Sequence, residues 1–196
     1  AAYTDTAAML AAESAPLVVV LTSHAAHAAV VRTALAADRH VFCQKPLALS
    51  PDDAWSLVRA ARDRGLALGC APVAPRRPAQ RRAAELLADG RLGRVRLAYA
   101  HAHVGRVTEW HDSPESFLAV GPLYDGAVYP LTVLTTLFGP VERVRTADAA
   151  LLLDEHAHNG RSFRVDTPDH VTAVLEMADG PLVHLTASAY VPHRTR

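Results

Sequence analysis

Two short apolar segments separated by one helix-length stretch constrain the fold of this chain more than any other feature. Residues 17–21 (LVVVL) are rich in β-branched residues, residues 40–43 (HVFC) are mostly apolar, and residues 25–38 between them carry apolar residues at helical spacing. Strands joined by a helix in this way run parallel. The pattern therefore predicts a parallel sheet, preceded by a short helix over residues 5–13 that Thr4 or Asp5 caps.

The alternation of strand and helix continues toward residue 70. Ser50 is followed by a proline and two aspartates, which is the order typical of a helix start, and Gly65 is placed to end that helix after Arg64. Residues 66–69 follow as a third strand. Prolines at 72, 75 and 78 then indicate a linker, so we expect a second domain to begin there.

The second half of the chain has a different character. Residues 79–89 and the apolar residues 123–138 predict helices, and we expect the second of these to be buried and to end at Gly139. Alternating or β-rich stretches predict strands over residues 94–104, 141–153, 170–177 and 182–190, the first of them antiparallel. The predicted fold class is α/β, with an incomplete Rossmann-like parallel sheet over residues 1–70. An α+β domain with a mainly antiparallel open sheet follows over residues 71–196.

Composition excludes several classes of partner. Half of the 196 residues are apolar, and the 20 Lys and Arg residues balance the 20 Asp and Glu residues. No net charge favours nucleic acid or an anionic membrane, and no apolar run approaches the roughly 20 residues of a membrane span. Cys43 and Cys70 are too few for a disulfide framework and are expected in the core, which fits the cytoplasm.

A lysine ends the second strand. Lys45 follows the apolar run 41–43 and directly precedes Pro46, which cannot continue a sheet. The carboxyl ends of parallel strands are where open α/β sheets bind ligands, and an ammonium group there can transfer a proton or polarise a carbonyl. Lys45 is therefore either a catalytic group or a solvated end of the strand.

Several motifs now resemble one family. Residues 22–27 (TSHAAH) and 40–46 (HVFCQKP) resemble the TPxxxH and HVxxEKP signatures of the Gfo/Idh/MocA family of sugar oxidoreductases. Residues 121–130 (GPLYDGAVYP) resemble its GGxxxDxGxH or GGxxxDxGxY helix, and residues 89–95, 138–141 and 167–171 also fit. The resemblance covers nearly the whole chain, with the motifs in the family's order.

The resemblance implies a function and a set of site residues. Lys45 matches the lysine beside the nicotinamide and the substrate hydroxyl, and Asp125 and Tyr129 match the helix residues that face the substrate and complete proton transfer. Pro46 matches a proline that often follows a cis peptide bond. The implied function is an NAD- or NADP-dependent oxidoreductase acting on a sugar, cyclitol or related polyol. The positions implied near the cofactor are Thr22, Ser23, His24, His27, Gln44, Lys45 and Pro46.

Alternatives stay open for several of these residues. Asp125 could cap the following helix, and Tyr129 could be a core aromatic. His27 could bond to the backbone rather than to a cofactor. The HxH pairs at 101/103 and 156/158 suggest a metal, but no third ligand is evident, and we expect no metal site.

A dinucleotide fold normally opens with a strand, a GxGxxG turn and a helix, and no such glycines precede Leu17. We therefore expect a fragment truncated at both ends. A non-catalytic dinucleotide-binding or regulatory relative and an inactive fragment are the alternatives to an enzyme. The resemblance also implies a homo-oligomer formed through the sheet of the second domain, whose alternation should leave an apolar face exposed.

Overall fold

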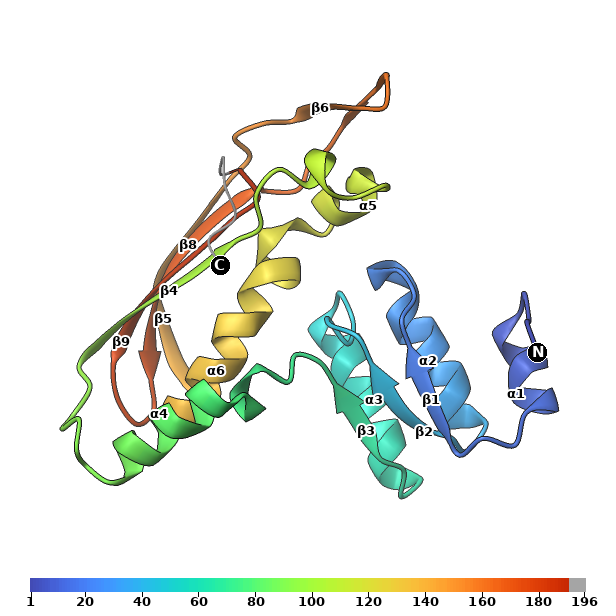
Figure 1. Cartoon of the computed structure of the whole chain (residues 1–196), viewed down its shortest axis with the longest axis horizontal. Coiled ribbons are helices and arrows are strands. Elements are labelled where there is room, and N and C mark those ends of the chain that lie inside the picture. Colours follow the sequence, from blue (N-terminus) through green and yellow to red (C-terminus); the bar gives the residue numbers. More distant parts are fainter. Residues whose placement is uncertain (191–196) are drawn as a thin grey trace. The chain divides into compact units, whose positions relative to one another are not determined.

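A computed structural model describes residues 1–190 of the chain (Figure 1). It divides into two compact units, residues 1–72 and residue 73 onward. In the first unit the strands are β1 (Leu17–Val20), β2 (His40–Cys43) and β3 (Leu68–Cys70), and the helices are α1 (Thr6–Ala12), the 3₁₀ turn η1 (His24–Ala26), α2 (His27–Ala36) and α3 (Pro51–Asp63).

The first unit is built on the predicted parallel sheet. Its order is β1-β2-β3, and both pairs run parallel, with Val20 opposite Cys43 and Cys43 opposite Cys70. Helices α2 and α3 cover one face, where Val31, Leu35 and Leu57 are almost completely buried against Val41 and other residues of the sheet. This arrangement confirms the prediction of an α/β unit.

Local signals set the helix ends of this unit. The Asp5 carboxylate accepts a hydrogen bond from the Ala8 amide at 2.8 Å, so Asp5 rather than Thr4 caps α1. Ser50 Oγ accepts one from the Asp53 amide at 3.4 Å at the start of α3. Gly65 follows α3 with φ of +67°, the left-handed conformation that glycine adopts without strain.

The second unit combines a mixed sheet with helices. Its strands are β4 (Leu97–His103), β5 (Val141–Ala150), β6 (Glu155–His158), β7 (Arg161–Arg164), β8 (His170–Met177) and β9 (Leu182–Ser188). Its helices are α4 (Pro78–Ala88), α5 (Pro114–Leu118) and α6 (Val128–Phe138), with 3₁₀ turns η2 (Ala74–Arg76) and η3 (Val107–Glu109) and the π-helical turn η4 (Leu123–Ala127).

The sheet of the second unit has the order β4-β9-β8-β5, in which β8 pairs antiparallel with both β9 and β5. The prediction that residues 94–104 form an antiparallel strand was wrong, because β4 pairs parallel with β9. The reason is the crossover between β4 and β5. The chain returns across the sheet through α6, so β5 runs in the same direction as β4. β8 is antiparallel to β5, and β9 is antiparallel to β8, so β9 also runs in the direction of β4.

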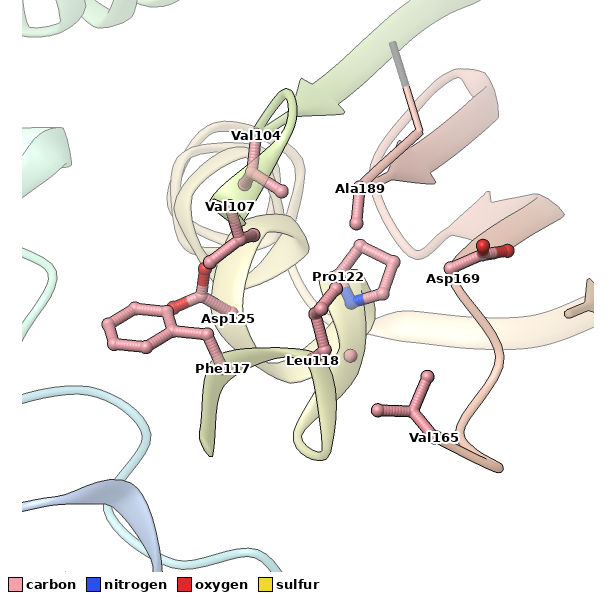
Figure 2. A pocket seen from close by; sticks show the side chains of 10 residues that line it. Val104, Val107, Phe117, Leu118, Pro122, Asp125, Val165, Asp169 and Ala189 are labelled. Atoms are coloured by element: carbon pink, nitrogen blue, oxygen red, sulfur yellow. The ribbon is translucent and has the colours of Figure 1, made fainter. Parts of the chain in front are cut away.

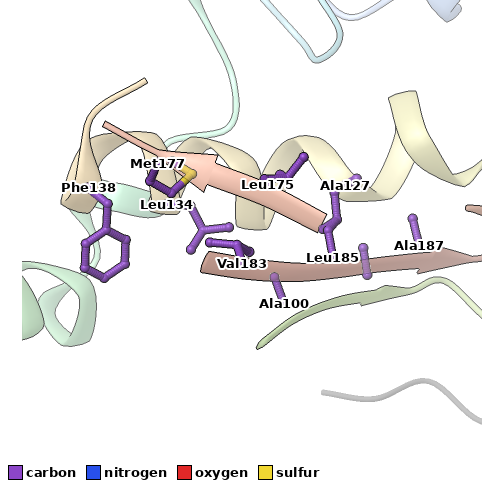
Figure 3. Packing of buried hydrophobic residues seen from close by; sticks show 10 residues of the cluster. Ala100, Ala127, Leu134, Phe138, Leu175, Met177, Val183, Leu185 and Ala187 are labelled. Atoms are coloured by element: carbon purple, nitrogen blue, oxygen red, sulfur yellow. The ribbon is translucent and has the colours of Figure 1, made fainter. Parts of the chain in front are cut away.

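One face of this sheet packs on α6. Figure 3 shows Leu134 and Phe138 of α6 against Leu175 and Met177 of β8, and against side chains of β9 and β4. The buried members of the cluster that lie on β9 and β4 are Val183, Leu185, Ala187, Ala100 and Ala102. The helix and the inward side chains of three neighbouring strands therefore form the core of the second unit.

Three expectations for this unit need correction. Residues 123–138 are not one buried α-helix, since they begin with the π turn η4 and Tyr129 is 41% exposed. The open face of the sheet is not uniformly apolar, because most apolar side chains of β8 and β9 face α6. Val174 and Leu182 lie on the open face, opposite His184 and Leu97 in the register. The exposed side chains of the open face include Tyr99, His101, Thr172 and His184. The hairpin β6-β7 was also missed, although Asn159-Gly160 between its strands is a strong turn signal.

The cysteines of β2 and β3 generate a prediction about stability. Burial raises the pKa of the Cys43 thiol from its ordinary value of 9.0 to about 12, with a smaller contribution from Cys70. Burial likewise raises the pKa of Cys70 to about 11. Above pH 9 the unfolded thiols ionise while the folded thiols keep their protons, so the folded state binds more protons and the free energy of unfolding falls as pH rises.

We expect urea denaturation between about pH 8 and about pH 11 to show this fall. The double variant Cys43→Ala/Cys70→Ala is the control, because tyrosine and arginine titrate in the same way in both proteins. Its unfolding free energy should depend less steeply on pH. Equal slopes for the two proteins would contradict the assignment.

Candidate functional site

The site residues of the first unit meet at one edge of its sheet. Thr22 and Ser23 follow β1, and Gln44 and Lys45 follow β2. The two strands run parallel and in register, and the Gln44 amide donates to the Val20 carbonyl at 2.9 Å. The carboxyl ends of β1 and β2 therefore bring the predicted cofactor positions and Lys45 together, at the edge where open α/β sheets bind ligands.

The environments of these residues differ. Lys45 is 9% exposed, whereas Thr22, Ser23 and Gln44 are exposed and His24 is half-buried. The Gln44 side chain accepts a hydrogen bond from the Lys45 amide at 2.9 Å, so it holds the backbone of the residue that follows it. The Lys45-Pro46 peptide bond is cis, as the resemblance implied.

His27 lies beneath this edge rather than on it. It is the first residue of α2 and is completely buried. Its Nδ1 lies 2.6 Å from the Pro46 carbonyl oxygen, and its Nε2 lies 3.1 Å from the Thr22 carbonyl oxygen. Both ring nitrogens therefore face the backbone, as in the alternative considered for this histidine.

The second group of predicted residues lies on one helical segment of the second unit. Asp125 is in the π turn η4 and is 6% exposed, while Tyr129 is in the first turn of α6 and is 41% exposed. Asp125 does not cap a helix, because Pro122 and Ala127 hold the N-cap positions, and Tyr129 is not a core aromatic. Asp125 and Tyr129 are four residues apart, but the π turn is wider than an α-helical turn, so the angle between them around the helix axis differs from that in an α-helix.

Asp125 lines a cavity of about 10 Å³, close to the room that one water molecule needs. Figure 2 shows Asp125 and Asp169 on opposite sides of it, with Leu118 and Pro122 between them. The remaining lining is apolar and comes from η3, from α5 and the turn after it, and from the residues that directly follow β4, β7 and β9. A carboxylate in so small an enclosure is held by its surroundings rather than exposed to bulk water.

Glycines allow the segment that carries Asp125 to pack closely. Gly121 has φ of +76°, and a Cβ on it would lie 2.9 Å from Thr167 Cγ2 and 3.0 Å from the Pro168 carbonyl oxygen. A Cβ on Gly126 would meet Val104 Cγ1 at 3.2 Å. A larger residue at Gly121 would therefore displace this segment from the loop before β8, whereas one at Gly126 would press against the Val104 side chain.

Sequence reasoning missed the role of Asp169. This aspartate is 3% exposed, and its carboxylate accepts hydrogen bonds from the Leu152 and Leu153 amides at 2.8 and 3.0 Å. Its backbone also pairs with Ala150 and Ala189, so one residue holds the ends of β5 and β9. The stretch TPDHV was part of the resemblance, but nothing local in it shows which amides a carboxylate will reach.

Two further observations bear on the class of site. Among residues 1–190, no group of three or more His, Cys, Asp or Glu side chains is arranged to hold a metal ion. Over the same residues, no helix is long and apolar enough to cross a membrane.

Family models match both units. Residues 1–71 match the model described as the oxidoreductase family with an NAD-binding Rossmann fold, and residues 80–196 match the GFO/IDH/MocA C-terminal domain. The chain belongs to the Gfo/Idh/MocA family. This membership confirms the resemblance and the class of fold that the sequence predicted.

Individual relatives agree with the family. The chain is 33% identical over 123 residues to a trans-1,2-dihydrobenzene-1,2-diol dehydrogenase of Macaca fuscata fuscata, a match that covers 60% of this chain and 35% of that protein. It is 38% identical over 77 residues to a 1,5-anhydro-D-fructose reductase of Ensifer adhaerens, covering 39% of this chain and 23% of the reductase. Both matches span less than half of the relative.

A solved levoglucosan dehydrogenase, in complex with NADH and levoglucosan, superposes with a TM-score of 0.85 at 20% identity. The superposition covers 99% of this chain and 53% of the dehydrogenase. This similarity supports the fold, and the chain again spans about half of the protein it matches.

The carboxyl edge of the first unit fits part of a dinucleotide. Its parallel strands end in exposed polar residues, Thr22, Ser23 and Gln44, beside a buried lysine, and the resemblance implies the nicotinamide end of the cofactor at this edge. The glycine-rich turn that binds the pyrophosphate in such folds is not among these residues. The residues present therefore fit one end of the cofactor and not its phosphates.

The contribution of the Asp169 carboxylate to the stability of the second unit can be measured. Asp169→Ala would leave the Leu152 and Leu153 amides without their acceptor, so we expect the free energy of unfolding to fall by about 1–3 kcal/mol. Asp166→Ala, at an exposed position on the same loop, should change it far less. Equal losses in urea denaturation would show that the two amide bonds contribute little.

Proposed function

We propose that the protein is an NAD(P)-dependent oxidoreductase that acts on CH–OH groups of a sugar, cyclitol or related polyol, with Lys45 in proton transfer. Membership of the Gfo/Idh/MocA family supports the class of reaction. The matched dehydrogenase and reductase, and the NADH complex of the levoglucosan enzyme, support the cofactor and the class of substrate.

The observation that carries the proposal is that a lysine, rather than an arginine, stands at position 45. It is the single lysine of the chain, and the other 19 of the 20 basic residues are arginine. Arginine cannot give up its proton in a protein, whereas lysine can act as an acid or a base. Lys45, the one lysine of the chain, is therefore buried at the carboxyl end of β2.

The proposed chemistry assigns a proton path to the residues of the chain. A bound nicotinamide would accept or return the hydride. In the oxidising direction, Lys45 Nζ takes the proton of the substrate hydroxyl, and in the reducing direction it returns that proton to the oxygen. Thr22, Ser23, His24, Gln44 and Pro46 form the polar edge against which the cofactor lies.

The second unit supplies the remaining roles. Tyr129 has an exposed side chain in the first turn of α6, so its phenol can reach a substrate and pass a proton. Asp125 is an acceptor for substrate hydroxyls or for the groups that hold them. These two assignments rest on the family resemblance and on the exposure of Tyr129.

Lys45→Arg tests the proposal because it keeps the positive charge and removes the proton transfer. We expect the turnover number with polyols and NAD or NADP to fall by about 10²–10⁴-fold in the full-length protein. Lys45→Ala should fall at least as far. The control is Arg59→Ala, at an exposed position on α3, which should leave turnover unchanged. Full activity in either Lys45 variant would refute the role of Lys45.

We also propose that the protein forms a homo-oligomer through the open face of the second sheet. The register places Tyr99 opposite His184, and their rings stack with centroids 5.3 Å apart. Tyr99 is 67% exposed and Leu97 is 45% exposed, so apolar area is available on a face that also carries polar side chains. This mixture of aromatic and polar side chains is typical of protein interfaces.

Light scattering after size-exclusion chromatography tests this second proposal. We expect the mass of a dimer or tetramer, and Tyr99→Asp should shift the population toward the monomer because it places a charge in the interface. Thr135→Asp, on the exposed side of α6, is the matched control and should keep the oligomer. A monomeric wild-type protein would contradict the proposal.

A further inference from the structure

The buried side chain of His27 links the two loops that carry the proposed cofactor and proton-transfer residues. Thr22 belongs to the loop after β1, and Pro46 belongs to the loop after β2. Each offers its carbonyl oxygen to one ring nitrogen of His27, at 3.1 Å and 2.6 Å. One side chain therefore spans the carboxyl ends of two neighbouring parallel strands.

The contact with Pro46 lies next to Lys45. The Gln44 side chain accepts from the Lys45 amide at 2.9 Å, and the His27 ring meets the carbonyl of the residue that follows Lys45. The backbone of Lys45 is thus held on both sides, once by an exposed side chain and once by a buried one. Small displacements of this backbone would be carried to the amine at the end of the side chain.

Burying polar atoms costs free energy unless they are hydrogen-bonded, and an aliphatic residue would fill the space of His27 without that cost. Only a side chain with two separate polar atoms can reach both carbonyls. This need explains a completely buried histidine at the first position of α2. The ring itself is enclosed, so its influence on a ligand passes through the two loops.

We propose that His27 is a positioning residue, which fixes Lys45 through the Pro46 carbonyl and the cofactor loop through the Thr22 carbonyl. The inference rests on the proposed function, since it gives the two loops their roles. Both partners are carbonyl oxygens, which only accept hydrogen bonds. The contact that positions Lys45 therefore requires a hydrogen on Nδ1, and the contact with Thr22 requires one on Nε2. The two contacts together require the imidazolium form, because a neutral imidazole donates from only one nitrogen.

Two substitutions separate the two contacts. The side-chain amide nitrogen of asparagine can take the place of Nδ1, and that of glutamine can take the place of Nε2. His27→Asn therefore keeps a donor for Pro46 and loses the one for Thr22, whereas His27→Gln does the opposite. Both variants remove the ring and its packing, so a merely structural role would affect them alike.

Steady-state kinetics of the full-length protein should distinguish the variants. We expect His27→Gln to lower kcat by about 10- to 100-fold, because a misplaced catalytic group slows the reaction by amounts of this order. His27→Asn should keep kcat within about threefold of the wild type and raise the KM for the dinucleotide. Equal losses of kcat that follow the losses in thermal midpoint would overturn the positioning role.

A measurement on the wild-type protein needs neither turnover nor a folded variant. Imidazole ¹⁵N NMR should show hydrogens on both ring nitrogens of His27 that exchange slowly with water. A hydrogen on Nε2 alone would overturn the positioning of Lys45, and a hydrogen on Nδ1 alone would overturn the bond to Thr22. If the protein turns over no polyol with either dinucleotide, the proposed function fails. The Nδ1 hydrogen still decides whether His27 holds the Pro46 loop.

Discussion

The parallel pairing of β1 and β2 is the constraint on which the candidate site depends. Parallel neighbours need a crossover, and α2 supplies it between Val20 and His40. Because the strands share a direction, the residues that follow them emerge at the same edge. Lys45 and the Thr22 loop meet there although they are more than twenty residues apart in the sequence. An antiparallel pairing would have placed them at opposite ends.

In both units, buried side chains hold loops through hydrogen bonds to the backbone. His27 reaches the carbonyls of Thr22 and Pro46, and Asp169 accepts from the amides of Leu152 and Leu153. Loops leave many backbone groups without a partner in a sheet or helix, and a buried polar side chain can satisfy them. The residues with the most specific surroundings are therefore supporting residues rather than those proposed to meet the ligand.

Much of the fold could be predicted because its signals are local. The Asp5 and Ser50 caps, the glycines after α3 and α6 and the apolar strands all lie where the sequence predicted them. The misses have physical reasons. The direction of β4 depends on α6, which returns the chain across the sheet, and the π turn at Asp125 lies where Gly126 packs close to Val104 and Ala102, residues distant in the sequence. The hairpin after β5 had a turn signal in Asn159-Gly160, but its two strands have only four residues each.

The sequence by itself determined the family, the parallel sheet and the position of Lys45 at a strand end, since motifs, hydrophobic periodicity and caps are read from neighbouring residues. Only the tertiary structure decided that His27 contacts two loops, that Asp169 holds two strand ends and that the open face of the second sheet mixes apolar and polar side chains. These properties depend on partners distant in the sequence. Burial and hydrogen bonding are set by where the folded chain brings such partners together.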